Sequence, residues 1–278
     1  MLVVGVLSAG SVAFAMPDTS RVPATNTRSG HPVVIPAHAV QVAENVFSLG
    51  SAVDPQSGKK VEGYMIISPK PAAKKPDGAL GGGKPGSVDT SSCYGFLAKD
   101  AKWKSVESWV VDPTNPEGLS EADVFALLDE SITKWEDAAD GSADNVVSTD
   151  ILGVGSIASG FAEVGVMDGV NGVRFGSLDI GTIGVTTIWG VFGGAPAGRE
   201  LVEWDQVYNT YYSWNVNGSM SDMDFESIAT HELGHSVGMA DLYTAECSEE
   251  TMYGYGSEGE TKARDLNAGD ITGISKLY

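Results

Sequence analysis

The chain has 278 residues, of which 42% are hydrophobic and 19% are charged, and beyond its first residues it contains no long apolar segment. This composition favours an exported, soluble globular protein. Its net charge of −20 is uneven, because residues 16–92 contain eight basic and six acidic residues (+2), whereas residues 93–278 contain nine and 31 (−22). An acidic C-terminal part argues against nucleic acid or an anionic membrane as a partner, although solubility or adaptation to salt would also explain it.

Residues 1–15 form a short apolar run that ends in a small-x-small pattern, Ala13-Phe14-Ala15. The run is too short to span a membrane, and its end is typical of a signal peptide, although a basic first region is missing. A buried strand is the alternative. We therefore expect a secreted, extracellular protein with no membrane segment beyond the export signal.

Residues 16–68 are predicted to be a propiece that is rich in β-structure. Apolar stretches at 33–35, 40–49 and 61–67 predict its strands, and a turn-like segment at 54–58 separates the last two. Residues 69–92 are rich in Pro, Lys and Gly and are predicted to form an exposed linker. A folded piece, a cleavable tether and a main domain are the layout of a zymogen, and an accessory domain that stays attached is the alternative.

Residues 93–278 are predicted to form the main domain. A helix should begin at Ser120, because acidic residues follow in its first turn and apolar residues recur at helical spacing as far as Trp135. A second helix should begin between Ser221 and Asp224, where a serine precedes an acid by three residues. Strands are predicted at 106–111, 164–167, 172–175, 184–192 and 200–208.

The segment HELGHSVGMAD, residues 231–241, gathers metal-ligand side chains at a spacing that suits zinc. Residues four apart lie on one face of a helix, so His231 and His235 can bind the same cation. Glu232 then lies beside the metal, where its carboxylate can take a proton from bound water. Gly238 can end the helix with a left-handed backbone, after which Asp241 offers an oxygen as the third ligand. Three protein ligands and a water are typical of a catalytic zinc rather than a structural one.

This segment resembles the extended motif HExxHxxGxxH of the metzincin metallopeptidases, which a methionine-containing turn follows. Residues 251–254 (TMYG) look like the matrixin Met-turn, and residues 266–278 (LNAGDITGISKLY) resemble the closing helix of matrixin catalytic domains. Asp241 stands at the last ligand position in place of His, as in the snapalysin-like branch. A chance HExxH on an ordinary amphipathic helix would not require these later features to follow in order.

The resemblance implies an α+β fold of metzincin type over residues 93–278. Its parts would be a twisted mixed sheet, a long backing helix, an active-site helix, a Met-turn and a C-terminal helix. It also implies that one catalytic zinc is held by His231, His235 and Asp241, with Glu232 as general base in the hydrolysis of internal peptide bonds. The substrate would be an extended peptide or an unfolded protein, and we expect a monomer.

Four further positions acquire roles from the resemblance. Met252 would pack beneath the metal, although a methionine is by itself as consistent with ordinary core packing. A tyrosine of the Met-turn, Tyr253 or Tyr255, would contact the oxyanion. The strand at 184–192 would lie at the sheet edge above the cleft, so a substrate peptide could add to it as an extra strand.

Two alternatives stay open. A secreted binding or inhibitory module could keep the fold and the metal without turnover, although the intact Glu232 speaks against this. A gluzincin-like enzyme would keep the two histidines but take its third ligand from Glu246 or Glu249, and Gly238 at its metzincin offset argues against that arrangement.

The sequence limits which metal ions other than the catalytic zinc the main domain can bind. Only four histidines exist, and His31 and His38 lie in the predicted propiece, so the main domain lacks the histidines for the structural zinc of many matrixins. Calcium stays possible, because the segments Asp137–Asn145 and Asp168–Asn171 contain oxygen ligands in turns that include glycine. Solvated turns without an ion are the alternative.

Cys93 and Cys247 are the two cysteines. In an exported protein an even pair favours a disulfide, which here would join the start of the main domain to the loop before Met252. The alternative is a switch in which the Cys93 thiolate binds the zinc of the zymogen, as in matrixin propeptides. The segment after Cys93 lacks the PRCGxPD pattern of that switch, so we favour the disulfide.

Overall fold

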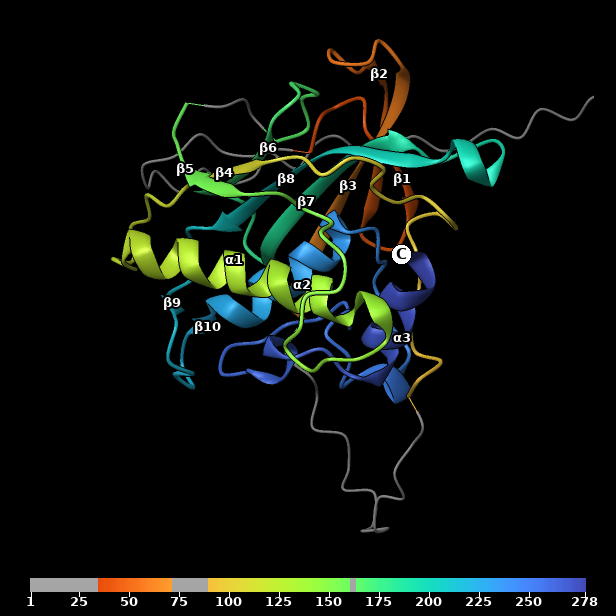
Figure 1. Ribbon diagram of the computed structural model, residues 1–278. Helices are drawn as coiled ribbons and strands as arrows, with labels where there is room; N and C mark the ends of the chain where they lie inside the picture. The colour runs from red at the N-terminus through yellow and green to blue at the C-terminus, as the bar shows by residue number, and fades with distance from the viewer. Residues whose placement is uncertain (1–34, 72–89, 161–163) are drawn as a thin grey trace, which may run out of the picture.

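The computed structural model describes residues 35–71, 90–160 and 164–278 (Figure 1). The predicted signal peptide and most of the predicted linker lie outside these residues. One sheet of eight strands has the spatial order β1 (Val40–Ala43), β2 (Val46–Val53), β3 (Lys60–Pro69), β7 (Thr182–Val191), β8 (Glu200–Asn209), β6 (Asn171–Gly176), β4 (Trp109–Asp112) and β5 (Gly155–Ile157). Neighbours from β1 to β8 pair antiparallel, and those from β8 to β5 pair parallel, so the sheet is mixed, as expected.

The helices lie on one side of this sheet (Figure 1). They are α1 (Glu121–Asp137), α2 (Phe225–Ser236) and α3 (Ala268–Leu277). Short 3-10 turns lie at Ala138–Asp140, Pro196–Gly198, Ala245–Cys247 and Lys262–Arg264, and a small parallel pair is formed by β9 (Trp214–Asn215) and β10 (Met223–Asp224). None of the helices in the described part of the chain is long and apolar enough to cross a membrane.

The first helix begins where the sequence predicts. Ser120 is its N-cap and accepts a hydrogen bond from the backbone N–H of Asp123, which satisfies one of the free donors of the first turn. At the other end, the indole N–H of Trp135 donates to the carbonyl of Thr230 in α2 at 2.9 Å. The hydroxyls of Ser131 and Thr230 are also hydrogen-bonded, at 2.9 Å. Helix α1 therefore holds α2 in place through buried hydrogen bonds as well as through packing.

Apolar side chains cover both faces of the sheet. The larger cluster fills the space between the sheet and the helices and includes Trp109, Trp135, Trp204 and Phe225, all at most 1% exposed. A smaller cluster on the opposite face joins residues of β2, β3, β7 and β8 to Val164 and Leu178. The sheet is therefore buried on both sides in its centre.

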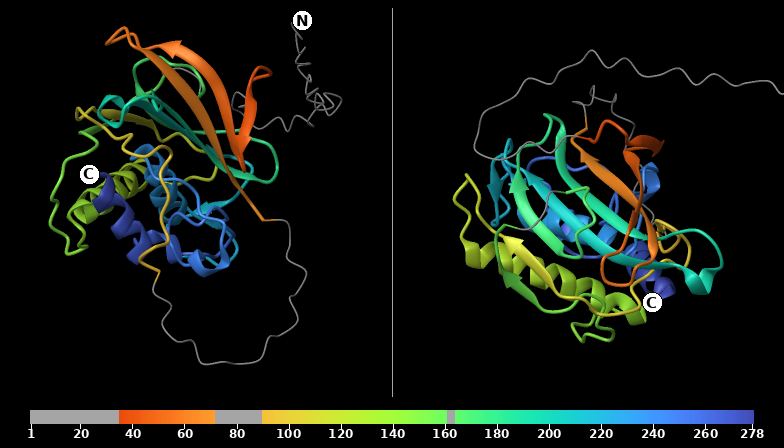
Figure 2. Two further views of the ribbon diagram at one scale, coloured as in Figure 1. Left: turned by 90° about the vertical axis from the view of Figure 1, so that its right-hand side faces the viewer. Right: turned by 90° about the horizontal axis from the view of Figure 1, so that it is seen from above.

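The N-terminal strands continue the sheet of the main domain, as both views of Figure 2 show in orange. β3 pairs with β7 in a register that places Ile66 opposite Thr186 and Ser68 opposite Gly184. Ile66 is 1% exposed and belongs to the larger core. The prediction that strand 184–192 is a free edge is therefore wrong in this structure, because β3 occupies the edge to which a substrate strand would add.

Two predicted strands differ from the structure. The stretch 40–49 is a hairpin of β1 and β2 instead of one strand, because Asn45 has a left-handed backbone (φ 57°) that turns the chain. Residues 164–167 form turns, since Gly165 has a φ of 91° that no strand accommodates. The strand predicted at 33–35 lies mostly outside the described residues. The other predicted strands form, with ends that differ by a few residues.

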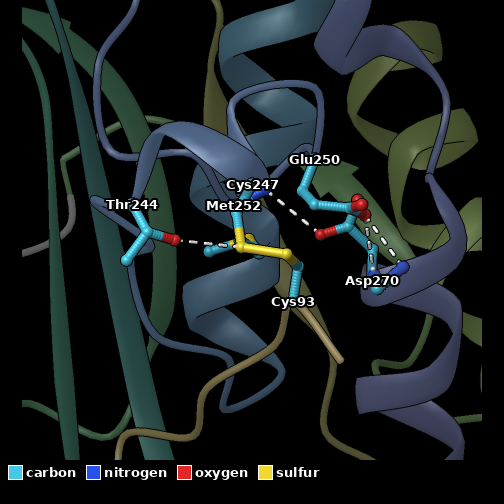
Figure 3. The surroundings of a disulfide bond; sticks show 7 residues. Cys93, Thr244, Cys247, Glu250, Met252 and Asp270 are labelled. Carbon is cyan, nitrogen blue, oxygen red and sulfur yellow. Dashed lines mark hydrogen bonds between the residues drawn. A yellow bond between two sulfur atoms is a disulfide. The ribbon is translucent and has the colours of Figure 1, made fainter. Parts of the chain in front are cut away.

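Cys93 and Cys247 form a disulfide, which confirms the prediction (Figure 3). Their Cα atoms are 5.5 Å apart, and the bridge joins residues 154 positions apart in the sequence. It ties the start of the main domain to the loop between α2 and the Met-turn. The alternative, in which Cys93 acts as a free thiol switch, requires a thiolate that this bridge removes.

We expect the double variant Cys93→Ala/Cys247→Ala to lower the free energy of unfolding by about 2 to 5 kcal/mol, because it releases a long loop in the unfolded chain. Urea unfolding of variant and wild type measures the difference. Thiol labelling of the denatured, unreduced wild type is the control. Two reactive thiols, or an unchanged unfolding midpoint, would contradict the structural role of the bridge.

Candidate metal centre

Helix α2 carries two imidazoles on one face and is held firmly at its N-terminus. Of the two residues between which the helix was expected to begin, Asp224 and not Ser221 is the N-cap. Its side chain accepts a hydrogen bond from the backbone N–H of Ser227 at 3.0 Å. The guanidinium of Arg264 binds both oxygens of Asp224, at 2.9 and 2.6 Å. All twelve residues of the helix are buried. Its histidines therefore lie inside the protein, at a depth where polar atoms need partners.

Backbone carbonyls orient both imidazole rings. Nδ1 of His231 lies 2.7 Å from the carbonyl oxygen of Thr251, and Nδ1 of His235 lies 3.0 Å from that of Met239. A carbonyl oxygen can only accept, so each Nδ1 carries a proton, and in the neutral ring Nε2 keeps the lone pair that binds a metal. These contacts thus turn two metal-binding nitrogens toward one point.

Asp241 brings an oxygen to the same point. Its Oδ1 lies 3.2 Å from Nε2 of His231 and 3.4 Å from Nε2 of His235. Ligand atoms about 2.1 Å from a tetrahedral zinc lie about 3.4 Å from one another, so both distances suit that ion. All three ligand atoms lie within 4.8 Å of one another. Gly238 makes this approach possible, because its φ of 105° turns the chain directly after the helix, as predicted.

The charges at this point also suit a cation. Burial lowers the pKa of His231, but the carboxylate of Asp241 outweighs it and raises that pKa to about 9. Burial raises the pKa of Asp241, whereas the two imidazoles lower it well below its usual range. The three ligand atoms also lack a hydrogen-bond partner within the described residues. A divalent cation would compensate the charge of the carboxylate and satisfy all three atoms.

Glu232 lies beside these ligands and is fully buried. The hydroxyl of Thr186 in β7 donates a hydrogen bond to its Oε2. Its Oε1 has no hydrogen-bond partner in the described part of the chain. The arrangement leaves one carboxylate oxygen available to accept a proton, which is what a general base requires.

Met252 packs beneath the helix. It is fully buried, and its sulfur contacts the backbone of Gly234, where an added Cβ would collide with it. Asp270 at the start of α3 accepts from the backbone N–H of Thr251 at 2.7 Å and of Met252 at 3.2 Å, as Figure 3 shows in part. Glu250 in turn accepts from the backbone N–H of Gly269 and Asp270. The closing helix therefore fixes the turn that holds the floor of the site.

The Met-turn tyrosines have other partners. The hydroxyl of Tyr255 donates to Glu44 at 2.9 Å, and the ring of Tyr253 lies under the ammonium of Lys262, 5.4 Å from its centroid. Neither contact places a hydroxyl at the three ligand atoms, so an oxyanion role stays a prediction for both tyrosines.

The structure adds a tyrosine that sequence reasoning missed. Tyr243 donates from its hydroxyl to Oδ2 of Asp241 at 3.0 Å, and Asn45 donates to the same hydroxyl at 2.9 Å. In the sequence only its place two residues after Asp241 could have indicated this contact. Two residues so close in a loop need not contact each other through their side chains. The two bonds hold Asp241 with Oδ1 turned toward the imidazoles.

A pocket opens next to His231. It lies between the end of β3, the first residues of β7, helix α2 and the segment that follows the Met-turn; its lining includes Ser68, Ile183, Ile228, Tyr255 and Ala263. Its walls are mainly apolar or backbone, so it is suited to an uncharged side chain of a bound peptide.

The remaining ligand candidates lie elsewhere. His231, His235 and Asp241 are the only group of three His, Cys, Asp or Glu in the described residues whose ligand atoms converge, and neither Glu246 nor Glu249 belongs to it. This geometry favours the metzincin arrangement over the gluzincin one.

The turns considered for calcium use their oxygens locally. Asp137 accepts from the backbone N–H of Asn145 and Val146. In the other turn, Asp168 accepts from the backbone N–H of Val170 at 2.9 Å. Beside this turn, Glu203 of β8 accepts from the backbone N–H of Asp168 and Gly169. Glu203 is fully buried, and burial raises its pKa to about 7 even though these bonds lower it.

We expect Glu203 to make the fold less stable as pH rises from about 4.5 to 7. The unfolded chain ionises at the lower pH, whereas the folded chain resists ionisation until its pKa of about 7. Glu203→Gln has the same shape, and a single amide oxygen can accept from both N–H groups. Between pH 5 and pH 8 the free energy of unfolding of the variant, measured with urea, should rise by roughly 2 kcal/mol relative to that of the wild type. A constant difference between the two proteins over that range would contradict this.

Comparison with known families agrees with the geometry. A family model described as Matrixin matches residues 191–278, which include the helix, the three ligand candidates, the Met-turn and the closing helix. No curated protein matches the chain. The matrixin similarity implies a catalytic zinc and a metalloendopeptidase type of hydrolase. The part of the chain that carries the site is therefore similar to the matrixin metallopeptidases.

Proposed function

We propose that the protein is a secreted zinc endopeptidase that hydrolyses internal peptide bonds of extended substrates, with Glu232 as general base. The observation that carries the proposal is the convergence of two imidazole nitrogens on one carboxylate oxygen, beside the buried carboxylate of Glu232. The two nitrogens lie 3.2 and 3.4 Å from that oxygen. His231, His235 and Asp241 are the ligands in this proposal, which makes the third ligand an aspartate as in the snapalysin-like branch.

Zinc at this point would supply a Lewis acid that lowers the pKa of water and polarises the scissile carbonyl. Glu232 accepts the proton of the attacking water at Oε1 and returns it to the nitrogen of the leaving amine. Thr251 and Met239 hold the imidazoles, and Tyr243 holds Asp241, so the ligands keep their positions while charge changes during the reaction.

A peptide is the substrate class that fits the surroundings of the site. The pocket beside His231 would receive one side chain of the substrate, and the edge of β7, once β3 has left it, would pair with the substrate backbone. A binding module without turnover is not favoured, because such a module has no use for a buried, oriented carboxylate next to the ligands. We include no calcium in the proposal, since the described residues offer no further convergent group of acidic ligands.

Substitutions at the site should distinguish the metal ligands from the general base. Glu232→Ala should leave zinc bound and lower kcat on casein by about 100-fold or more, because it removes the proton acceptor and no ligand. Asp241→Ala should instead weaken zinc retention, because only two protein ligands remain, and Asp241→His should preserve some of it. Metal content measured beside proteolytic rate distinguishes these outcomes, and a chelator should abolish wild-type activity, which zinc restores.

Glu246→Ala and Glu249→Ala are matched controls, since both glutamates are exposed and lie a few residues after Asp241. They should bind zinc and cleave casein like the wild type. Loss of zinc in either control, with retention in Asp241→Ala, would move the third ligand and support the gluzincin arrangement. A wild-type protein that holds zinc but cleaves no peptide would support the binding module.

We also propose that residues 16–68 keep the enzyme latent as a propiece. The turn between β1 and β2 lies at the rim of the site, because Glu44 binds Tyr255 and Asn45 binds Tyr243, the partner of Asp241. β3 occupies the edge of β7, and Ser68 lines the pocket beside His231. A substrate strand would compete with β3 for the same backbone groups.

The uncleaved chain should therefore show little activity, and cleavage between Pro69 and Cys93 should increase it by allowing β1 to β3 to leave. The double variant Glu44→Ala/Asn45→Gly should raise the activity of the uncleaved chain several-fold, because each lost hydrogen bond contributes about 1 kcal/mol to the closed state. Glycine suits the positive φ of position 45.

Gln41→Ala is the control, since Gln41 is exposed on β1 and bonds only its own hairpin. Casein hydrolysis before and after limited proteolysis is the measurement. Full activity in the uncleaved wild type would show instead that the segment is an accessory part of the enzyme.

A further inference from the structure

Thr186 contacts the proposed general base from the sheet, and nothing in the HExxH segment accounts for it. Its hydroxyl donates to Oε2 of Glu232, and both residues are fully buried. Within the described residues this is the hydrogen bond that the Glu232 carboxylate makes, because Oε1 has no partner. One oxygen is therefore held by the sheet while the other is left for the reaction.

The strand gives Thr186 a fixed position. β7 lies between β3 and β8, and Thr186 pairs with Ile66 on one side and Gln206 on the other. A β-branched side chain in a strand also has few χ1 choices, so its hydroxyl loses little freedom on making the bond. The donor is thus held in place before substrate binds, as electrostatic preorganisation requires.

Gly184 completes the arrangement two residues earlier on the same face. A Cβ at this position would lie 2.6 Å from Oε1 of Glu232. The strand therefore offers a hydroxyl to one carboxylate oxygen and open space to the other. A larger residue at 184 would displace the oxygen that has to accept the proton.

We propose that Thr186 is a positioning residue for catalysis, which orients the Glu232 carboxylate so that Oε1 faces the attacking water. This proposal rests on the proposed peptidase function. Thr186 does not touch the substrate or the metal; it acts by fixing the rotation of the carboxylate. Its loss should consequently reduce kcat while leaving zinc binding and KM unchanged.

The test compares three variants of the full chain, assayed before and after cleavage of residues 69–92, with zinc content, kcat and KM measured for each. Thr186→Val keeps the shape and removes the donor, so kcat should fall about tenfold, as expected for loss of a hydrogen bond to a charged group. Thr186→Ser keeps the donor and should restore kcat to within about threefold of wild type. Thr186→Ala repeats the loss of the donor without burying a second methyl group.

Thr187→Val is the matched control. Thr187 is also fully buried, lies on the opposite face of the strand and makes no side-chain hydrogen bond in the described part of the structure. It should keep the wild-type kcat.

The outcomes separate this inference from the proposed function. If wild type cleaves casein, Glu232→Ala does not, and Thr186→Val has unchanged kcat, the positioning role is wrong and the peptidase stands. Equal losses of kcat in the Ser and Val variants would likewise overturn it, because they would show a packing effect. An inactive zinc-bound wild type would overturn the peptidase itself. Should Thr186→Val fail to fold, as judged by thermal unfolding, the Ser and Ala pair decides the same question.

Discussion

The structure depends on bringing three buried ligand atoms of three side chains to one point. Nε2 of His231 and His235 lie 3.2 and 3.4 Å from one oxygen of Asp241, in a place where side chains are nearly inaccessible to water. Buried polar groups without partners are costly, so the Asp241 carboxylate needs a positive charge beside it, which a cation or a protonated imidazole would supply. Helix α2, the turn at Gly238 and the loop to Met252 together place these atoms.

Much of the surrounding structure limits movement of these atoms. Carbonyls of Thr251 and Met239 fix the two rings, and Asp270 fixes the backbone that supplies one of those carbonyls. The disulfide holds the loop between α2 and the Met-turn against the start of the domain. Burial together with Glu250 raises the pKa of Asp270 to about 7, so this support carries an electrostatic cost that packing has to offset.

The N-terminal strands have two roles that are difficult to separate. β3 adds core residues such as Ile66 and Met65, and it covers the edge of β7 that lies beside Glu232. A segment that only blocked the site would need few buried apolar residues, whereas one that only stabilised the sheet would not need contacts with Tyr243 and Tyr255. Release of such a segment must expose apolar surface unless a substrate strand takes its place.

The sequence by itself determined the local parts of the site. Four-residue spacing places His231 and His235 on one helical face, and a glycine at 238 permits the turn, because both effects act within a few residues. Ser120 marked the start of α1 for the same reason. The disulfide followed from having only two cysteines in a chain expected to be exported.

Only the tertiary structure decided which distant residues support the site. Thr186, Tyr243 and Asn45 belong to no motif, since each acts through side-chain hydrogen bonds that no local pattern predicts. Asp270 lies in the segment that resembles the closing helix, but that resemblance did not show that it accepts from the backbone of Thr251 and Met252. The pairing of β3 with β7 was equally hidden, because an alternating apolar pattern says which face of a strand is buried and not which strand lies beside it. Local periodicity is written in the sequence, whereas the choice among strand partners depends on the summed packing of the whole sheet.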